Sequence, residues 1–155
     1  MSKSLKRVRA ALTSAGLATE IVELGETRTA QQAADAAGCH VDQIAKSVIF
    51  RGASSDAVLL FLTAGGNRVS PEKAAAVAGE ALAKADAAFI RERTGFAIGG
   101  VSPFGHPSPP RAFCDPRLTE FAEIWAAAGT PRHIFRLTPR QILTETKAQL
   151  ADFTE

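Results

Sequence analysis

The segment Thr94–His106, TGFAIGGVSPFGH, combines four glycines and a proline with apolar residues that belong in a protein interior. Glycine has no Cβ, so the main-chain N–H groups around Gly99 and Gly100 can approach a ligand closely. A run of such donors binds an oxyanion or a phosphate. A tight bend or bulge in a strand uses the same residue types. The glycines alone are therefore compatible with an anion-binding loop and with a purely structural bend.

Lys46 lies inside an apolar run, IAKSVIFR (Ile44–Arg51), where a charged side chain is unusual. In an extended strand it shares a face with Val48 and Phe50, and the opposite face is no more polar. Such a lysine is either an exposed residue of an edge strand or a cation at the rim of a pocket.

The other reactive side chains form no known catalytic or metal-binding pattern. The three histidines lack the paired spacing of metal ligands, and the two cysteines match no metal or redox motif. There is no GxSxG motif, and Ser102 has no histidine–acid pair near it in the sequence. His133 follows a turn of small residues, where it stands either beside a pocket or exposed at the start of a strand. We therefore expect no metal and no cofactor, and chemistry that depends on positioning and main-chain electrostatics.

Composition and charge exclude several classes of protein. The 155 residues, 46% hydrophobic and 22% charged, predict one globular domain over residues 1–155. GFAIGG is not GxGxxG and follows a predicted helix, and no Walker motif occurs, so both nucleotide-binding motifs are absent. No apolar run approaches the ~20 residues that cross a bilayer. A net charge of +2 permits a nucleic-acid partner without requiring one, and a DNA-binding protein is usually more basic.

The basic, amphipathic N-terminus is predicted to be a helix rather than a signal peptide, with a mitochondrial transit peptide as the remaining alternative. Unpaired cysteines favour a reducing, cytoplasmic location.

Capping signals place five helices between short strands. The helices are expected from the N-terminus to Gly16, over Thr29–Gly38, Pro71–Gly79 and Ala87–Gly95, and over Pro139–Leu150. The strands are expected at Thr19–Leu24, Ile44–Arg51, Ala57–Gly65, Arg111–Asp115, Phe121–Gly129, His133–Leu137 and Ala151–Phe153. The order is not a regular βαβ alternation, so we predict an α+β fold with a mostly antiparallel sheet.

Three segments in this order, IAKSVIFR with Lys46, TGFAIGGVSPFGH and AAGTPRHIFRLTP, resemble the YbaK family. This family is also called the prolyl-tRNA-synthetase-associated domain family of aminoacyl-tRNA deacylases. Its members are free-standing relatives of the editing domain of bacterial prolyl-tRNA synthetases, and they hydrolyse the ester between a wrongly attached amino acid and tRNA. The resemblance runs from about Thr29 to the C-terminus. It implies one compact domain in which a curved, mostly antiparallel mixed sheet is flanked by helices.

The resemblance also implies which residues act. The family's lysine corresponds to Lys46, and its GxxxP loop corresponds to Gly99, Gly100, Val101, Ser102 and Pro103. The later turn, where some members carry a pocket histidine, corresponds to Gly129–His133. N–H groups from Gly100 to Ser102 are expected to stabilise the oxyanion, each contributing roughly 3 kcal/mol, while Pro103 stiffens the loop. Lys46 is expected to bind the phosphate or ribose of the terminal adenosine, or to orient the amino acid.

The expected substrate is alanine or cysteine on tRNA-Pro, the further partner to be tested is an aminoacyl-tRNA synthetase, and the expected site of action is the cytoplasm. Pocket size is expected to depend on Ile44, Val48, Phe61 and Phe96, with Gly129 and His133 alongside. Two alternatives stay open at this point. One is a non-catalytic module of the same fold that docks on a synthetase or tRNA, and the other is hydrolysis of a small free aminoacyl ester.

Overall fold

The computed structural model describes residues 2–155, and its helices begin at the capping residues that the sequence predicts. Side-chain oxygens of Thr29, Ser70, Asp86 and Thr138 each accept a hydrogen bond from a main-chain N–H of the first helical turn. The helices are α1 (Lys3–Ser14), α2 (Ala30–Ala37), α3 (Pro71–Ala78), α4 (Ala87–Thr94) and α5 (Pro139–Thr146). In the described residues no helix is long and apolar enough to span a membrane.

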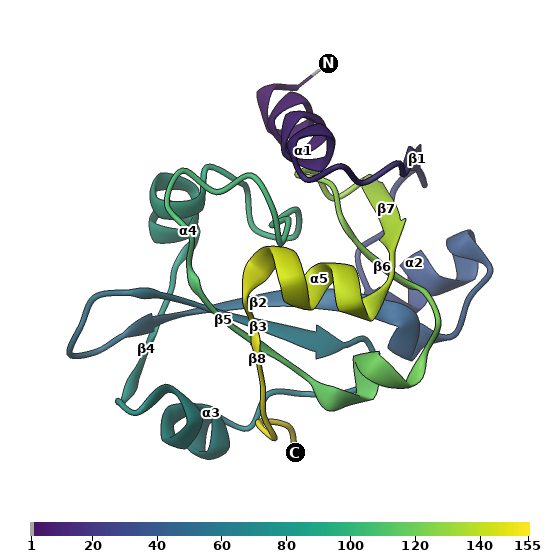
Figure 1. The fold of residues 1–155 in the computed structure, drawn as a ribbon. Coiled ribbons are helices and arrows are strands. Elements are labelled where there is room, and N and C mark those ends of the chain that lie inside the picture. Colours follow the sequence, from purple (N-terminus) through teal and green to yellow (C-terminus); the bar gives the residue numbers. More distant parts are fainter. Residues whose placement is uncertain (1) are drawn as a thin grey trace.

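Eight strands form one open, mixed sheet, which confirms the predicted α+β class (Figure 1). They are β1 (Ile21–Glu23), β2 (Ile44–Gly52), β3 (Val58–Ala64), β4 (Leu82–Lys84), β5 (Arg111–Cys114), β6 (Ile124–Ala127), β7 (His133–Leu137) and β8 (Gln149–Leu150). Their order is β1-β7-β6-β2-β3-β5-β8, and β4 also pairs with β2. Four pairings are antiparallel, and the pairings β2–β6, β3–β5 and β5–β8 are parallel.

Alternation along β3 separates two hydrophobic cores. Leu60 and Leu62 face a core that includes α1, α4 and α5, whereas Leu59 and Phe61 face a core that includes α3 and the C-terminal Phe153. Helices α1 and α3 accordingly lie on opposite sides of the sheet (Figure 1). A third cluster packs α2 against the start of β2.

The C-terminal segment differs from the prediction. The last helix ends at Thr146 instead of Leu150 because Lys147 adopts a left-handed conformation, with φ of 56°. Gln149–Leu150, which was expected to be helical, forms β8 by pairing with β5, and Ala151–Phe153 is not a strand. The strand expected over Phe121–Gly129 is confined to Ile124–Ala127.

The short β4 was not predicted at all. It pairs with the far end of β2, along the edge that carries β6 at the near end. Three residues carry too little alternation to be recognised as a strand.

Candidate active site

A cleft of about 210 Å³ opens beside the middle of β2. The start of β2 pairs with β6 through Ile44 and Ala45, and its end pairs with β4 through residues 50–52. Because β3 occupies the other edge of β2, residues 46–49 have no strand neighbour on the cleft side. Lys46 lines the cleft together with the loop of Gly99 and Val101 and the turn of Thr130 and His133. The structure thus brings together the three segments that the sequence singles out.

The loop Gly99–Pro103 is held against the second turn by close main-chain packing. Gly99 has a φ of +88°, and the N–H of Gly100 donates to the carbonyl of Ala97 at 3.0 Å, which closes a tight turn. A Cβ on Gly100 would lie 2.8 Å from the Cα and carbonyl carbon of Thr130. Gly100 is therefore needed for the contact between the two turns, and its N–H is already used.

Two other N–H groups of this loop lack a partner within the described residues. Val101 is 4% exposed and Ser102 is fully buried, yet neither N–H donates to a protein acceptor. A buried N–H without an acceptor is unfavourable, and such groups are rare in folded proteins. Val101 lines the cleft, so its unpaired N–H is suited to a negatively charged oxygen of a ligand, whereas Ser102 is not among the residues that line the cleft.

His106 fixes the far end of the same loop. Its Nε2 lies 2.6 Å from the carbonyl oxygen of Ser102, so Nε2 carries the proton and donates. The ring packs edge-on against Phe96, and the Arg7 guanidinium lies 4.5 Å from the centre of the Phe96 ring. Burial lowers the pKa of His106, and its hydrogen bond to Ser102 only partly opposes that effect. His106 is thus a neutral donor that orients the loop.

The Lys46 ammonium group donates to the main-chain carbonyl of Asn67 at 2.6 Å. Burial lowers the pKa of Lys46, and the positive charge of Arg68 lowers it further, whereas the Asp115 and Asp42 carboxylates raise it. The side chain therefore places a positive charge at one end of the cleft.

The turn before β7 presents His133 in a fixed orientation. Thr130 Oγ1 lies 2.6 Å from His133 Nδ1 and also accepts from the N–H of Arg132. His133 Nε2 lies 3.9 Å from a carboxylate oxygen of Glu23 on the neighbouring strand β1. Thr130 therefore controls the direction of the ring, a role that the sequence did not assign to it.

The four residues expected to set pocket size lie in different places. Ile44 lines the cleft, where alanines of α2 and β6 (Ala30, Ala33, Ala126 and Ala127) form much of the remaining wall. Val48 packs on the α3 side of the sheet, and Phe61 is fully buried there. Phe96 is fully buried in the opposite core. The structure therefore does not bring Val48, Phe61 or Phe96 to the cleft.

The cysteines and the acidic residues do not add a nucleophile or a metal site. Burial raises the pKa of Cys114 to about 12, and the adjacent Asp115 charge adds to that shift. Burial also raises the pKa of Cys39. Within residues 2–155 no group of three or more metal-ligating side chains comes together.

Comparison with known proteins identifies the family of this chain. Residues 25–144 match the model of the aminoacyl-tRNA editing domain. The chain belongs to the aminoacyl-tRNA editing domain family. It is therefore an aminoacyl-tRNA deacylase of the YbaK type.

Individual relatives extend the match over nearly the whole chain. The uncharacterized protein YwhH of Bacillus subtilis (strain 168) is 32% identical over 140 residues, which cover 90% of this chain and 88% of that protein. A crystal structure described as "a putative trans-editing enzyme for prolyl tRNA synthetase" is 46% identical, with a TM-score of 0.93. The two chains overlap over 100% and 99% of their lengths. A structure from computational epitope grafting onto scaffold proteins is 44% identical, covers 100% and 99%, and has a TM-score of 0.92.

Helix α1 lies outside the segment that matches the editing domain, yet it packs beside both loops of the candidate site. A Cβ on Gly129 would lie 2.8 Å from the main-chain oxygen of Ser4, and one on Gly105 would lie 3.4 Å from that of Arg7. The Arg7 guanidinium also donates to the carbonyl of Thr94 at 3.3 Å. Gly129, next to Thr130, and Gly105, two residues after Pro103, thus both pack against helix α1.

Proposed function

We propose that this deacylase removes a small amino acid, alanine or cysteine, from mischarged tRNA-Pro and that it acts in trans. The observation that carries the proposal is the cleft itself. Lys46, Val101 with its unpaired N–H group, and His133 line a space of about 210 Å³.

The chemistry of ester hydrolysis matches these groups. When water or the neighbouring ribose hydroxyl attacks the ester carbonyl, negative charge develops on the carbonyl oxygen. In our proposal the N–H group of Val101, which lines the cleft, donates to that oxygen, and one such donor contributes roughly 3 kcal/mol. Gly99 and Gly100 shape the loop, and Pro103, which has no N–H, stiffens it. No protein nucleophile is required, which is consistent with the raised pKa of both thiols.

Lys46 is assigned to the nucleotide end of the substrate. Its ammonium group has donors beyond the one used by Asn67, because an ammonium group has three N–H bonds. A phosphate or ribose oxygen of the terminal adenosine is the proposed acceptor. His133, at the turn on the other side of the cleft, is proposed to contact the amino-acid end or the attacking water.

Selection by size follows from the alanine-rich wall. An apolar pocket distinguishes one methylene by only ~1–3 kcal/mol, so a pocket cannot easily favour a large amino acid without admitting a small one. The reverse is easier, because a narrow pocket excludes a larger side chain by steric overlap. We propose that Ile44, Ala33 and Ala126 exclude proline in this way and admit alanine.

The test is deacylation of tRNA-Pro charged in turn with Ala, Cys, Ser, Thr and Pro. We expect rapid loss of Ala or Cys and survival of Pro-tRNA-Pro. A protein that left the whole panel intact, with or without added prolyl-tRNA synthetase, would contradict the proposal. Alanyl esters of adenosine alone are the matched control, because equal turnover of these would indicate a small-ester hydrolase. Binding of the same tRNAs without turnover would indicate a docking module.

A further inference from the structure

The partner of the Lys46 ammonium group is a main-chain carbonyl in the turn between β3 and α3. This carbonyl belongs to Asn67, and the Nζ–O distance is 2.6 Å. A lysine side chain is a flexible chain of four carbons, so the position of its ammonium group depends on the acceptor that it binds. The position of the Asn67 carbonyl therefore decides where the positive charge stands in the cleft.

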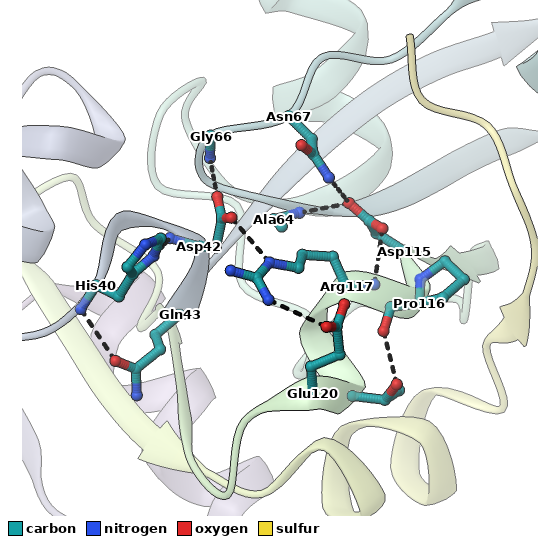
Figure 2. Close-up of polar contacts among 11 residues, drawn as sticks. His40, Asp42, Gln43, Ala64, Gly66, Asn67, Asp115, Pro116, Arg117 and Glu120 are labelled. Atoms are coloured by element: carbon teal, nitrogen blue, oxygen red, sulfur yellow. Dashed lines mark hydrogen bonds and ion pairs between the residues drawn. The ribbon is translucent and has the colours of Figure 1, made fainter.

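The turn that carries this carbonyl is held by the buried carboxylate of Asp115 (Figure 2). Asp115 is 3% exposed. Its Oδ2 accepts from the N–H of Ala64 at 3.1 Å and from the Asn67 side-chain amide at 2.9 Å, and its Oδ1 accepts from the N–H of Arg117 at 3.0 Å. One carboxylate thus binds both ends of the turn, residues 64 and 67.

A second carboxylate holds the middle of the turn. Asp42 Oδ1 accepts from the N–H of Gly66 at 2.8 Å, and Asp42 Oδ2 accepts from Arg117 Nε at 2.9 Å. Arg117 joins the two carboxylates, since its main chain binds Asp115 and its side chain binds Asp42 (Figure 2). The turn is therefore fixed from elements that lie before β2 and after β5.

We infer that Asp115 is a positioning residue for Lys46: it orients the Asn67 carbonyl, and that carbonyl places the ammonium group where the substrate's phosphate or ribose oxygen must bind. This inference rests on the substrate role proposed for Lys46. The Asp42–Arg117 pair supports the same turn from its outer side. Asp115 is not among the residues that line the cleft, and it acts on Lys46 through the Asn67 turn and through its own negative charge.

The experiment is a double-mutant cycle between the turn and Lys46. Asn67→Ala removes the side-chain bond to Asp115 and keeps the main-chain carbonyl. Asp115→Asn keeps the size of the side chain and removes its charge. We expect each change to raise KM for the mischarged aminoacyl-tRNA about 3- to 10-fold, the effect of one misaligned hydrogen bond, with a smaller effect on kcat.

In a Lys46→Ala background the same two substitutions should have no further effect, because there is no ammonium group left to position. If Asn67→Ala and Asp115→Asn raised KM by the same factor in the wild-type and the Lys46→Ala backgrounds, the inference would be overturned. Asp56→Asn is the matched control. It also removes a carboxylate, but Asp56 lies in the exposed β2–β3 hairpin, where it pairs with Arg51 and Arg93. It should leave KM unchanged.

A second measurement does not depend on activity. The ¹⁵N–¹H signal of the Lys46 ammonium group, assigned by its loss in Lys46→Met, reports the local charge directly. Asp115→Asn should lower the pKa of Lys46 because a nearby negative charge is lost; an unchanged pKa would overturn the inference. If the wild-type protein failed to deacylate any tRNA, the proposed function would fail while this titration still decided the contact.

Discussion

Gly100 packs directly on the main chain of Thr130, and this contact joins the two loops of the site. A Cβ at residue 100 would lie 2.8 Å from two main-chain atoms of Thr130, which is closer than real Cβ contacts allow. The two loops can therefore lie this close together only because residue 100 has no Cβ.

Gly100→Ala should therefore reduce deacylation at least tenfold and destabilise the fold by about 1–3 kcal/mol, the usual cost of overpacking. Both follow from pushing the loops apart. Gly79→Ala is the control, because Gly79 has a φ of +77° with open space around it and lies at the end of α3. It should cost stability and leave deacylation intact. Unchanged activity in Gly100→Ala would contradict the loop-spacing argument.

Lys46→Ala should lower kcat/KM about 10- to 100-fold, since a hydrogen bond to a charged group contributes about 1.5–3 kcal/mol. Burial lowers the pKa of Lys46, so its charge should be lost below the ordinary lysine value of about 10.4. Binding of a non-hydrolysable amide analogue of the aminoacyl-tRNA should weaken as the pH rises through the pKa of Lys46. Lys46→Arg should keep the charge and abolish this alkaline loss; a similar loss in the arginine variant would exclude Lys46 as its cause.

Thr130→Val removes the hydroxyl that lies 2.6 Å from His133 Nδ1 and frees the ring. Deacylation should fall about tenfold, as expected for the loss of one orienting hydrogen bond and some misalignment. Thr130→Ser retains the hydroxyl and should restore most of the rate. If Thr130→Ser lost as much activity as Thr130→Val, the loss of the hydroxyl would not explain the effect, and the orienting role of Thr130 would be contradicted.

Neither cysteine should be needed for activity. The thiol of Cys114 is fully buried and its pKa is raised to about 12, so it should resist a thiol reagent until the protein unfolds. Cys39 is only partly buried and should react first. The variant with Cys39→Ser and Cys114→Ala should deacylate at the wild-type rate, measured on Ala-tRNA-Pro. A large loss that was not explained by stability would reveal a thiol-dependent step.

Asp42 should make the fold more stable above about pH 4 than below it. Burial alone would raise the pKa of Asp42, but hydrogen bonds from Arg117 and the N–H of Gly66 outweigh it and lower the pKa. A lowered pKa in the folded state gives stability that is present above the unfolded value of about 3.9 and is lost as the pH falls through the folded value. Urea unfolding between pH 2 and 7 should show a shallower acid loss for Asp42→Asn. If the free energy of unfolding fell with decreasing pH equally in the wild type and in Asp42→Asn, other carboxylates would be responsible for the loss of stability in acid.

Local signals in the sequence predicted most of the elements and the three segments of the site. Capping residues such as Thr29 and Thr138 can be recognised in the sequence because their hydrogen bonds reach only three residues along the chain. The partners of Lys46 and Gly100 cannot be predicted in this way, because Asn67 and Thr130 are far away in the sequence and only the folded sheet places them next to Lys46 and Gly100. Phe61 and Phe96 look like pocket residues in sequence, and only the register of the sheet and the packing of α4 show that they are core.

Helix α1 gives the two loops a common seat. Gly129 rests on Ser4, and Gly105 rests on Arg7, one turn further along the same helix. A shift of either loop would have to move helix α1 or break the contact with it. We therefore expect the distance between the two loops to stay constant when a substrate binds. In the function proposed above, a constant spacing would exclude a larger amino acid when the substrate binds, before the ester is attacked.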